Sequence, residues 1–134
     1  MTEAGTTVTK LLFIALGGAV GAMARYLVAG WGQNLTAGSF PLGTLIVNLT
    51  GCLLIGWLAS VLAGPVLIRE EFRMALLVGF LGSFTTFSTF GFETGNLLSD
   101  GEWVQAAWNL GLSNGLGLVA IFAGMRLATL THGA

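Results

Sequence analysis

Charged residues are scarce in this chain. Its 134 residues include five lysines or arginines and six aspartates or glutamates, so only 8% of the sequence is charged. A soluble globular domain has about 25% charged residues. The chain therefore has too few charges to cover a surface in water, and its net charge of −1 without a basic run excludes a typical nucleic-acid-binding protein.

The residues on which most enzymes and metal sites depend are also nearly absent. Cys52 is the single cysteine, which excludes an intramolecular disulfide, and the single histidine, His132, lies in the C-terminal tail. No apolar stretch carries a pair of carboxylates, and nothing resembles a phosphate-binding loop or a metal-ligand cluster. We therefore expect that the protein is not an enzyme.

The chain is rich in apolar residues: 54% of its residues are hydrophobic, and the mean hydropathy is +0.86. Four stretches come close to the roughly 20 residues that a helix needs to cross a bilayer. They are residues 11–30, 43–63, 72–98 and 103–126. We predict an all-α membrane protein with a single four-span domain over residues 1–134, a retained first span, and antiparallel neighbouring helices joined by short connections.

The few charges indicate an orientation. Four spans put both termini on one side of the membrane, where Lys10, Arg69, Arg73 and Arg126 fall, whereas Arg25 lies toward the other side. Because basic residues concentrate on the cytoplasmic side of membrane proteins, this distribution favours termini inside the cell.

The chain has 21 glycines, and several are four residues apart on one helix face. These pairs are Gly17 and Gly21, Gly91 and Gly95, and Gly111 and Gly115. Small residues at this spacing let membrane helices approach closely. We interpret the first and third pairs as ordinary contacts within the helix bundle.

The third span contains a sequence that suits a helix poorly. Gly79, Gly82 and Ser83 precede Phe84-Thr85-Thr86, which sets flexible residues beside β-branched ones. One interpretation is a broken helix, whose freed carbonyl groups carry partial negative charge and can hold a cation. The other is an unbroken helix whose hydroxyl groups bond to the preceding turn. The spacing does not separate the two.

Polar residues form stripes in the other spans. Thr44 and Asn48 lead to Gly51 or Cys52 in the second span, and Asn109 leads to Ser113 and Gly117 in the fourth. Glu93 is the only acidic residue within a span, and Arg25 is the only base well inside one. Ionisable residues in a membrane indicate function, although both lie near span ends, where long side chains also reach to the interface.

The donors in these stripes suit a small anion. Hydroxyl and amide N–H groups of Ser88, Thr89, Ser113 and Asn48 can replace the water around such an ion. Phe87 and Phe90 lie three residues apart, and the edge of a phenyl ring is positively polarised. Ring edges would hold an anion less tightly than an arginine. The sequence therefore predicts an anion path through the bundle.

These residues resemble the motifs of one known family, the Fluc (CrcB) bacterial fluoride channels, over nearly the whole chain. The motifs are Gly17-Gly18-x-x-Gly21-Ala22-x-x-Arg25-Tyr26 in the first span, Gly43-Thr44-Leu45-x-Val47-Asn48-x-x-Gly51 in the second, and Gly79-Phe80-x-Gly82 with Thr85-Thr86-Phe87-Ser88-Thr89-Phe90 in the third. The third motif is the most specific.

The resemblance implies a homodimer of antiparallel, dual-topology subunits in the bacterial inner membrane, with two pores that export fluoride passively from a cell loaded by entry of HF. It also implies roles for single residues. They are Phe87 and Phe90 as pore phenylalanines, Asn48 as a pore amide, Ser88, Thr89 and Ser113 as a track of hydroxyls, Glu93 on the same route, Arg25 near a vestibule, and the carbonyl groups of Gly82 and Thr85 as ligands of a structural sodium ion at the dimer centre. This sodium site favours the broken form of the third span.

The chain departs from the family pattern in a few places. Ser83 and Gly91 stand where the family often has Gly and Ser, and Gly117 stands where a further hydroxyl is expected, which leaves the far end of the track open. The charge bias also opposes insertion in both orientations, but we retain dual topology because the motif match is the stronger evidence.

Three other functions fit a small four-span protein. A dual-topology multidrug exporter needs a titratable acid deep in the bundle, whereas the first span has none and Glu93 lies late in the third. A fluoride–proton antiporter would move the same ion uphill in a pH gradient. A membrane scaffold would tolerate changes at Phe87.

Overall fold

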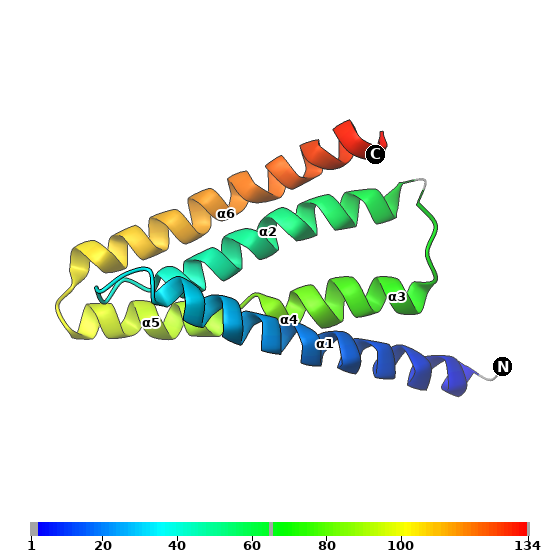
Figure 1. The fold of residues 1–134 in the computed structure, drawn as a ribbon, viewed down its shortest axis with the longest axis horizontal. Helices are drawn as coiled ribbons and strands as arrows, with labels where there is room; N and C mark the ends of the chain where they lie inside the picture. Colours follow the sequence, from blue (N-terminus) through cyan, green and yellow to red (C-terminus); the bar gives the residue numbers. More distant parts are fainter. Residues whose placement is uncertain (1–2, 65, 134) are drawn as a thin grey trace.

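The computed structural model describes residues 3–64 and 66–133, which fold into long helices packed side by side (Figure 1). The first two spans are α1 (Glu3–Gln33) and α2 (Leu42–Ala63). The third comprises α3 (Glu70–Met74), the π-helical segment η1 (Ala75–Leu81), α4 (Gly82–Phe84) and α5 (Phe87–Ser99). The last span is α6 (Trp103–His132).

Four helical stretches in the described residues are long and apolar enough to cross a membrane. They are Thr6–Gln33, Leu42–Ala63, Glu70–Ser99 and Trp103–His132, and they contain the four predicted spans. The prediction of an all-α chain with four such helices is confirmed, and the protein is a multi-pass membrane protein.

Both termini lie at the same end of the bundle, beside the connection between α2 and α3 (Figure 1). An ion pair of 2.9 Å between Lys10 and Glu70 links α1 to α3 there, and Arg69 pairs with Glu71 at 3.4 Å. At the opposite end, Gln33 donates to the carbonyl of Phe40 at 3.1 Å, so the end of α1 holds the connection to α2.

Glycines set the closest helix contacts. A side chain at Gly17 or Gly21 of α1 would run into the backbone carbonyls of Ala75 and Phe80, so both glycines are bundle contacts, as predicted. Gly56 of α2 and Gly124 of α6 are equally confined, because each faces the backbone of the other helix. Backbones without side chains between them gain van der Waals contact that lipid cannot supply.

The same interpretation is wrong for Gly111 and Gly115. Nothing lies within 4 Å of the position that a side chain would take at either residue. The physical reason is the orientation of α6, which packs on α2 with the face that carries Gly117 and Gly124. Gly91 and Gly95 of α5 are open in the same way, so these two stripes face away from the chain's own helices.

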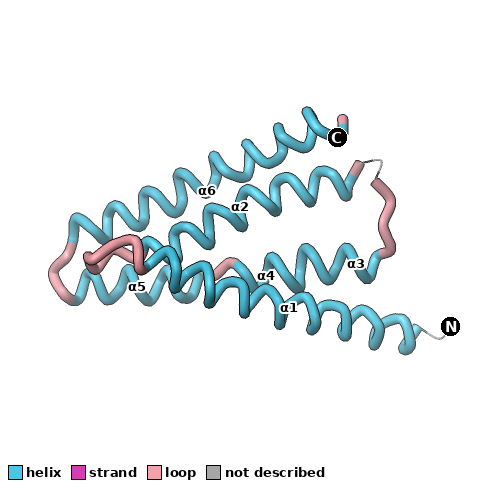
Figure 2. Tube along the Cα trace, in the orientation of Figure 1, coloured by secondary structure: helices cyan, strands magenta, loops and turns pink. Residues whose placement is uncertain are grey.

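Two residues with extended backbone separate α4 from α5, seen as a short loop between them in Figure 2. Thr85 has φ −81° and ψ 159°, and Thr86 has φ −151° and ψ 119°. The segment before them, η1, is π-helical, a form that occurs in short stretches and often near functional sites.

Candidate functional site

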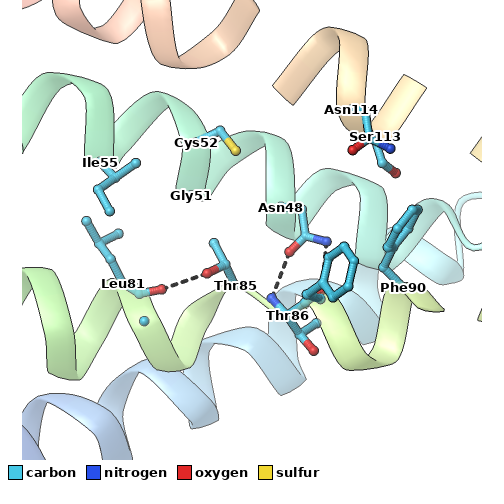
Figure 3. Close-up of a pocket in the computed structure, with 12 residues that line it drawn as sticks. Asn48, Gly51, Cys52, Ile55, Leu81, Thr85, Thr86, Phe90, Ser113 and Asn114 are labelled. Carbon is cyan, nitrogen blue, oxygen red and sulfur yellow. Dashed lines mark hydrogen bonds between the residues drawn. The ribbon is translucent and has the colours of Figure 1, made fainter. Parts of the chain in front are cut away.

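A pocket of about 280 Å³ opens beside this extended segment (Figure 3). Residues from α2, from the third span and from α6 line it. They are Asn48, Gly51, Cys52, Ile55, Leu81, Gly82, Thr85, Thr86, Phe87, Phe90, Ser113 and Asn114. Five of these residues have polar side chains, namely Asn48, Thr85, Thr86, Ser113 and Asn114.

Six of the residues singled out in the sequence meet in this pocket, although they come from three spans. They are Asn48, Gly82, Thr85, Phe87, Phe90 and Ser113. Ser88, Thr89, Glu93 and Arg25 do not line it. The pocket therefore brings together the Asn48 amide, the two phenyl rings, the Ser113 hydroxyl, and Gly82 and Thr85, the two residues that the resemblance suggests as sodium ligands.

The Asn48 side chain binds the backbone of Thr86 with both ends of its amide. Its Nδ2 donates to the Thr86 carbonyl at 3.0 Å, and its Oδ1 accepts from the Thr86 N–H at 2.8 Å. Figure 3 shows Asn48 reaching from α2 toward this segment. Because an extended residue between two helices loses the usual helical partners, Asn48 supplies the bonds that the backbone lacks. One N–H of its amide remains for another acceptor.

Thr86 begins α5. Its hydroxyl oxygen accepts the backbone N–H of Thr89 at 3.2 Å, which is a helix N-cap, and its hydroxyl donates to the Thr89 Oγ1 at 3.0 Å. The Ser88 hydroxyl lies 3.4 Å from the same oxygen. Ser88 and Thr89 are exposed in the first turn of α5, next to the pocket rather than in its wall.

Phe87 and Phe90 differ greatly in burial. Phe90 is 6% exposed, whereas Phe87 is 81% exposed. Their ring centroids are 5.5 Å apart and the rings are tilted by 48°. One ring thus forms part of the interior wall, and the other stands at the open side of the pocket.

Ser113 is the outer member of a chain of hydrogen bonds between α6 and α5. Its hydroxyl donates to the Asn109 Oδ1 at 3.3 Å, and the Asn109 Nδ2 donates to the Thr94 Oγ1 at 2.9 Å. Thr94 donates to the carbonyl of Phe90 at 2.7 Å. Asn109 is 1% exposed and Thr94 is 6% exposed, so these bonds form away from water.

Glu93 and Arg25 lie apart from the pocket. Glu93 Oε1 accepts from the Thr44 hydroxyl at 2.7 Å, between α5 and α2. Its Oε2 is buried and has no hydrogen-bond partner among the described residues. Arg25 is half-buried on α1.

Residues 12–125 match the model of a protein family described as "CrcB-like protein, Camphor Resistance (CrcB)". The chain belongs to the CrcB family. The chain is also similar to curated relatives that are each named "Fluoride-specific ion channel FluC". The relative from Geobacter sulfurreducens is 48% identical over 120 residues, which cover 90% of this chain and 97% of that protein.

Two more relatives have the same name. The relative from Nitrosococcus oceani is 47% identical over 119 residues, or 89% of this chain and 95% of that protein. The relative from Maridesulfovibrio salexigens is 44% identical over 121 residues, which cover 90% of this chain and 96% of that protein. The CrcB relatives bear the name of an ion channel and not of an enzyme, in agreement with the prediction from the sequence.

Sequence reasoning assigned no site role to some residues that the structure brings to the site. Thr86 and Asn114 line the pocket, and Asn109 and Thr94 support it from behind. Asn109 was part of the polar stripe of the fourth span, so its spacing was a usable signal. Thr94 had no such signal in the sequence, because only its position opposite Asn109 in the structure distinguishes it from other threonines.

Proposed function

We propose that this chain is a fluoride-selective channel of the bacterial inner membrane, which lets fluoride leave the cell passively and lowers its toxicity in the cytoplasm. The observation that carries the proposal is the pocket where Asn48, Ser113 and the rings of Phe87 and Phe90 meet. The names of the relatives support fluoride as the ion.

The chemistry of the pocket suits a small anion that must be held and released. Phe87 and Phe90 offer polarised ring edges, which attract an anion without the strength of a full positive charge. Ser113 and the remaining N–H of Asn48 supply hydrogen-bond donors. The N-terminal end of α5, where Ser88 and Thr89 lie, has a partial positive charge from the helix dipole and continues the route beyond the pocket.

Glu93 and Arg25 act outside the pocket. Glu93 lies nearly two turns beyond Phe87 on α5 and, with Thr44, marks the polar part of the route toward the end of the bundle that holds the α5–α6 connection. Arg25 raises the local concentration of anions at a vestibule.

The third span works as two half-helices that meet at Thr85 and Thr86, and the carbonyl oxygens of Gly82 and Thr85 hold a structural sodium ion. The residues fit such an ion. Gly82 is exposed, and a side chain there would meet only the Leu77 carbonyl oxygen, at 3.9 Å, so the backbone at this first residue of α4 is open where it lines the pocket. Carbonyl oxygens are hard, neutral ligands at the negative end of a helix dipole, which suits a hard cation.

The working assembly is an antiparallel homodimer. Two carbonyl oxygens from one chain are too few for a sodium ion, and a second copy related by a two-fold axis supplies the same two. The 81% exposure of Phe87 supports a second copy on the open side of the pocket, because a pore phenylalanine cannot work facing lipid.

A fluoride–proton exchanger is the alternative, together with a small multidrug exporter. The Oε2 atom of Glu93, which is buried and has no hydrogen-bond partner among the described residues, favours a proton-coupled exchanger, because such a carrier needs an acid within the bundle. A pH gradient across vesicles separates the two. A channel lets fluoride run down its own gradient only, whereas an exchanger accumulates fluoride against it.

The proposal can be tested in bacteria that lack their own fluoride exporter. Expression of the wild-type chain restores growth in fluoride, and expression of Phe87→Ile does not, at equal protein levels in the membrane. Growth that is not restored by the wild-type chain contradicts the proposal.

A further inference from the structure

The donor direction of Ser113 poses a problem for an anion path. Its hydroxyl hydrogen points inward to the Asn109 Oδ1, so Ser113 turns oxygen lone pairs toward the pocket that it lines. Lone pairs repel an anion, and the hydroxyl must reverse before it can donate to one. The bond that holds it is 3.3 Å long, longer than the usual O–H···O distance, and is therefore weak.

Asn109 can allow this reversal, because the two ends of an amide have the same shape and opposite hydrogen-bonding character. If the amide turns over, its N–H donates to the Ser113 Oγ and its oxygen accepts from the Thr94 hydroxyl. Thr94 then gives up its bond to the Phe90 carbonyl, which keeps its place in the helix. The Ser113 hydrogen becomes free to point into the pocket.

The number of hydrogen bonds in the two arrangements depends on whether an anion is present, and this links the reversal to ion binding. In the observed arrangement three bonds run from Ser113 through Asn109 and Thr94 to Phe90. The reversed arrangement has two such bonds in an empty pocket, and a third when Ser113 donates to an anion. A bond to a charged acceptor is also stronger than a neutral one.

We propose that Asn109 is the positioning residue for Ser113: its amide reverses when an anion enters, and the reversal turns the Ser113 hydroxyl from acceptor to donor. This inference rests on the proposed function, since it needs an anion in the pocket. Asn109 acts through Ser113 and at 1% exposure does not line the pocket itself.

A double-mutant cycle on fluoride efflux from vesicles tests the inference. Ser113→Ala reduces efflux by about tenfold, the scale of one hydrogen bond to a charged group. Asn109→Leu removes the acceptor that holds the Ser113 hydroxyl inward, so it changes efflux only while Ser113 is present, and the double variant matches Ser113→Ala to within about twofold. A further change of efflux in the double variant overturns the inference, because Asn109 then acts independently of Ser113.

Asn109→Asp provides a second readout that keeps the size of the side chain. A neutral carboxyl both donates and accepts, so it can reverse as the amide does, whereas an ionised one only accepts and holds the Ser113 hydroxyl inward. Fluoride efflux through this variant therefore decreases as the pH is raised from about 4 to about 9, because the carboxyl group loses its proton over that range. The new charge also repels fluoride directly, and the same titration with Ser113→Ala measures that contribution alone.

The inference requires a larger pH dependence when Ser113 is present than when it is replaced. Equal dependence in the two backgrounds overturns it. The neighbouring elements α2 and α5 carry two titratable side chains, Cys52 and Glu93, and the wild-type protein measured over the same range corrects for both. Absence of fluoride efflux in the wild-type protein itself would instead reject the proposed function.

Discussion

Asn48 on α2 satisfies both backbone polar groups of Thr86 on the third span, with bonds of 3.0 and 2.8 Å. A single side chain thus stabilises the extended segment between α4 and α5 and fixes the position of the helix that carries Phe87 and Phe90. In a membrane, where water cannot replace lost bonds, such an interaction determines the local backbone.

Replacing Asn48 with leucine will therefore destabilise the protein. Two backbone groups lose their partners, and each unsatisfied group costs about 1–3 kcal/mol. Thermal unfolding in detergent measures the loss. Asn114→Leu is the matched control, because among the described residues the Asn114 side chain bonds only to the Leu110 carbonyl of its own helix, and this substitution should cost less than about 0.5 kcal/mol. Equal stability of the two variants would contradict the role assigned to Asn48.

Substitutions at Phe87 and Phe90, the two phenylalanines proposed to line the pore, should separate effects on function from effects on stability. Phe87→Ile and Phe90→Ile both reduce fluoride flux strongly, since both remove a polarised ring edge. Phe90→Ile also lowers stability by about 1–2 kcal/mol, because Phe90 is 6% exposed and the smaller side chain leaves a gap.

Phe92→Ile is the control for both variants. Phe92 is 71% exposed on the same helix and does not line the pocket, so its replacement leaves flux unchanged. Full flux in both Phe87→Ile and Phe90→Ile would rule out the ring edges as part of the path.

The contact between Glu93 and Thr44 predicts a compensating pair of substitutions. Thr44→Val removes the donor to a carboxyl group whose other oxygen is already unpartnered, and costs about 1–3 kcal/mol. Adding Glu93→Met replaces both partners by apolar groups and recovers most of that loss. Chemical unfolding of the two variants measures the recovery. A double variant that is less stable than Thr44→Val would show that Glu93 has another essential partner.

Close packing of α2 on α6 makes Gly124 sensitive to the smallest side chain. Gly124→Ala would place a methyl group against the carbonyl of Leu53, so the helices must separate and stability falls by about 1–3 kcal/mol. Gly30→Ala is the control, because nothing lies within 4 Å of that position. It should stabilise α1 slightly, as alanine favours a helix over glycine. A neutral Gly124→Ala would refute the close contact.

Much of this fold could be predicted from the sequence, because four long apolar stretches allow few arrangements. Hydrophobicity predicted the number of spanning helices but not their ends, since α1 and α6 extend beyond the predicted spans. The stripes at Asn48 and Ser113 identified the faces that line the pocket. The spacing of residues shows which of them share a helix face, but not which helix packs against that face. For this reason Gly111 and Gly115 were assigned to contacts within the bundle that the structure does not show.

The roles of single polar groups lay beyond the sequence for the same reason. Asn48 was expected to face an ion, whereas one of its two N–H groups and its amide oxygen bind the backbone of Thr86. The link between Asn109 and Thr94 depends on how α6 lies against α5, and no pattern within either helix encodes that distance.

The central claim is that this chain conducts fluoride selectively and passively. The most direct test uses the purified wild-type protein in vesicles loaded with fluoride and chloride, with the membrane potential collapsed by an ionophore and the efflux of both ions followed by electrodes. We expect fast loss of fluoride, little loss of chloride, and no effect of an imposed pH gradient. Retention of fluoride by vesicles that contain well-folded protein would contradict the account.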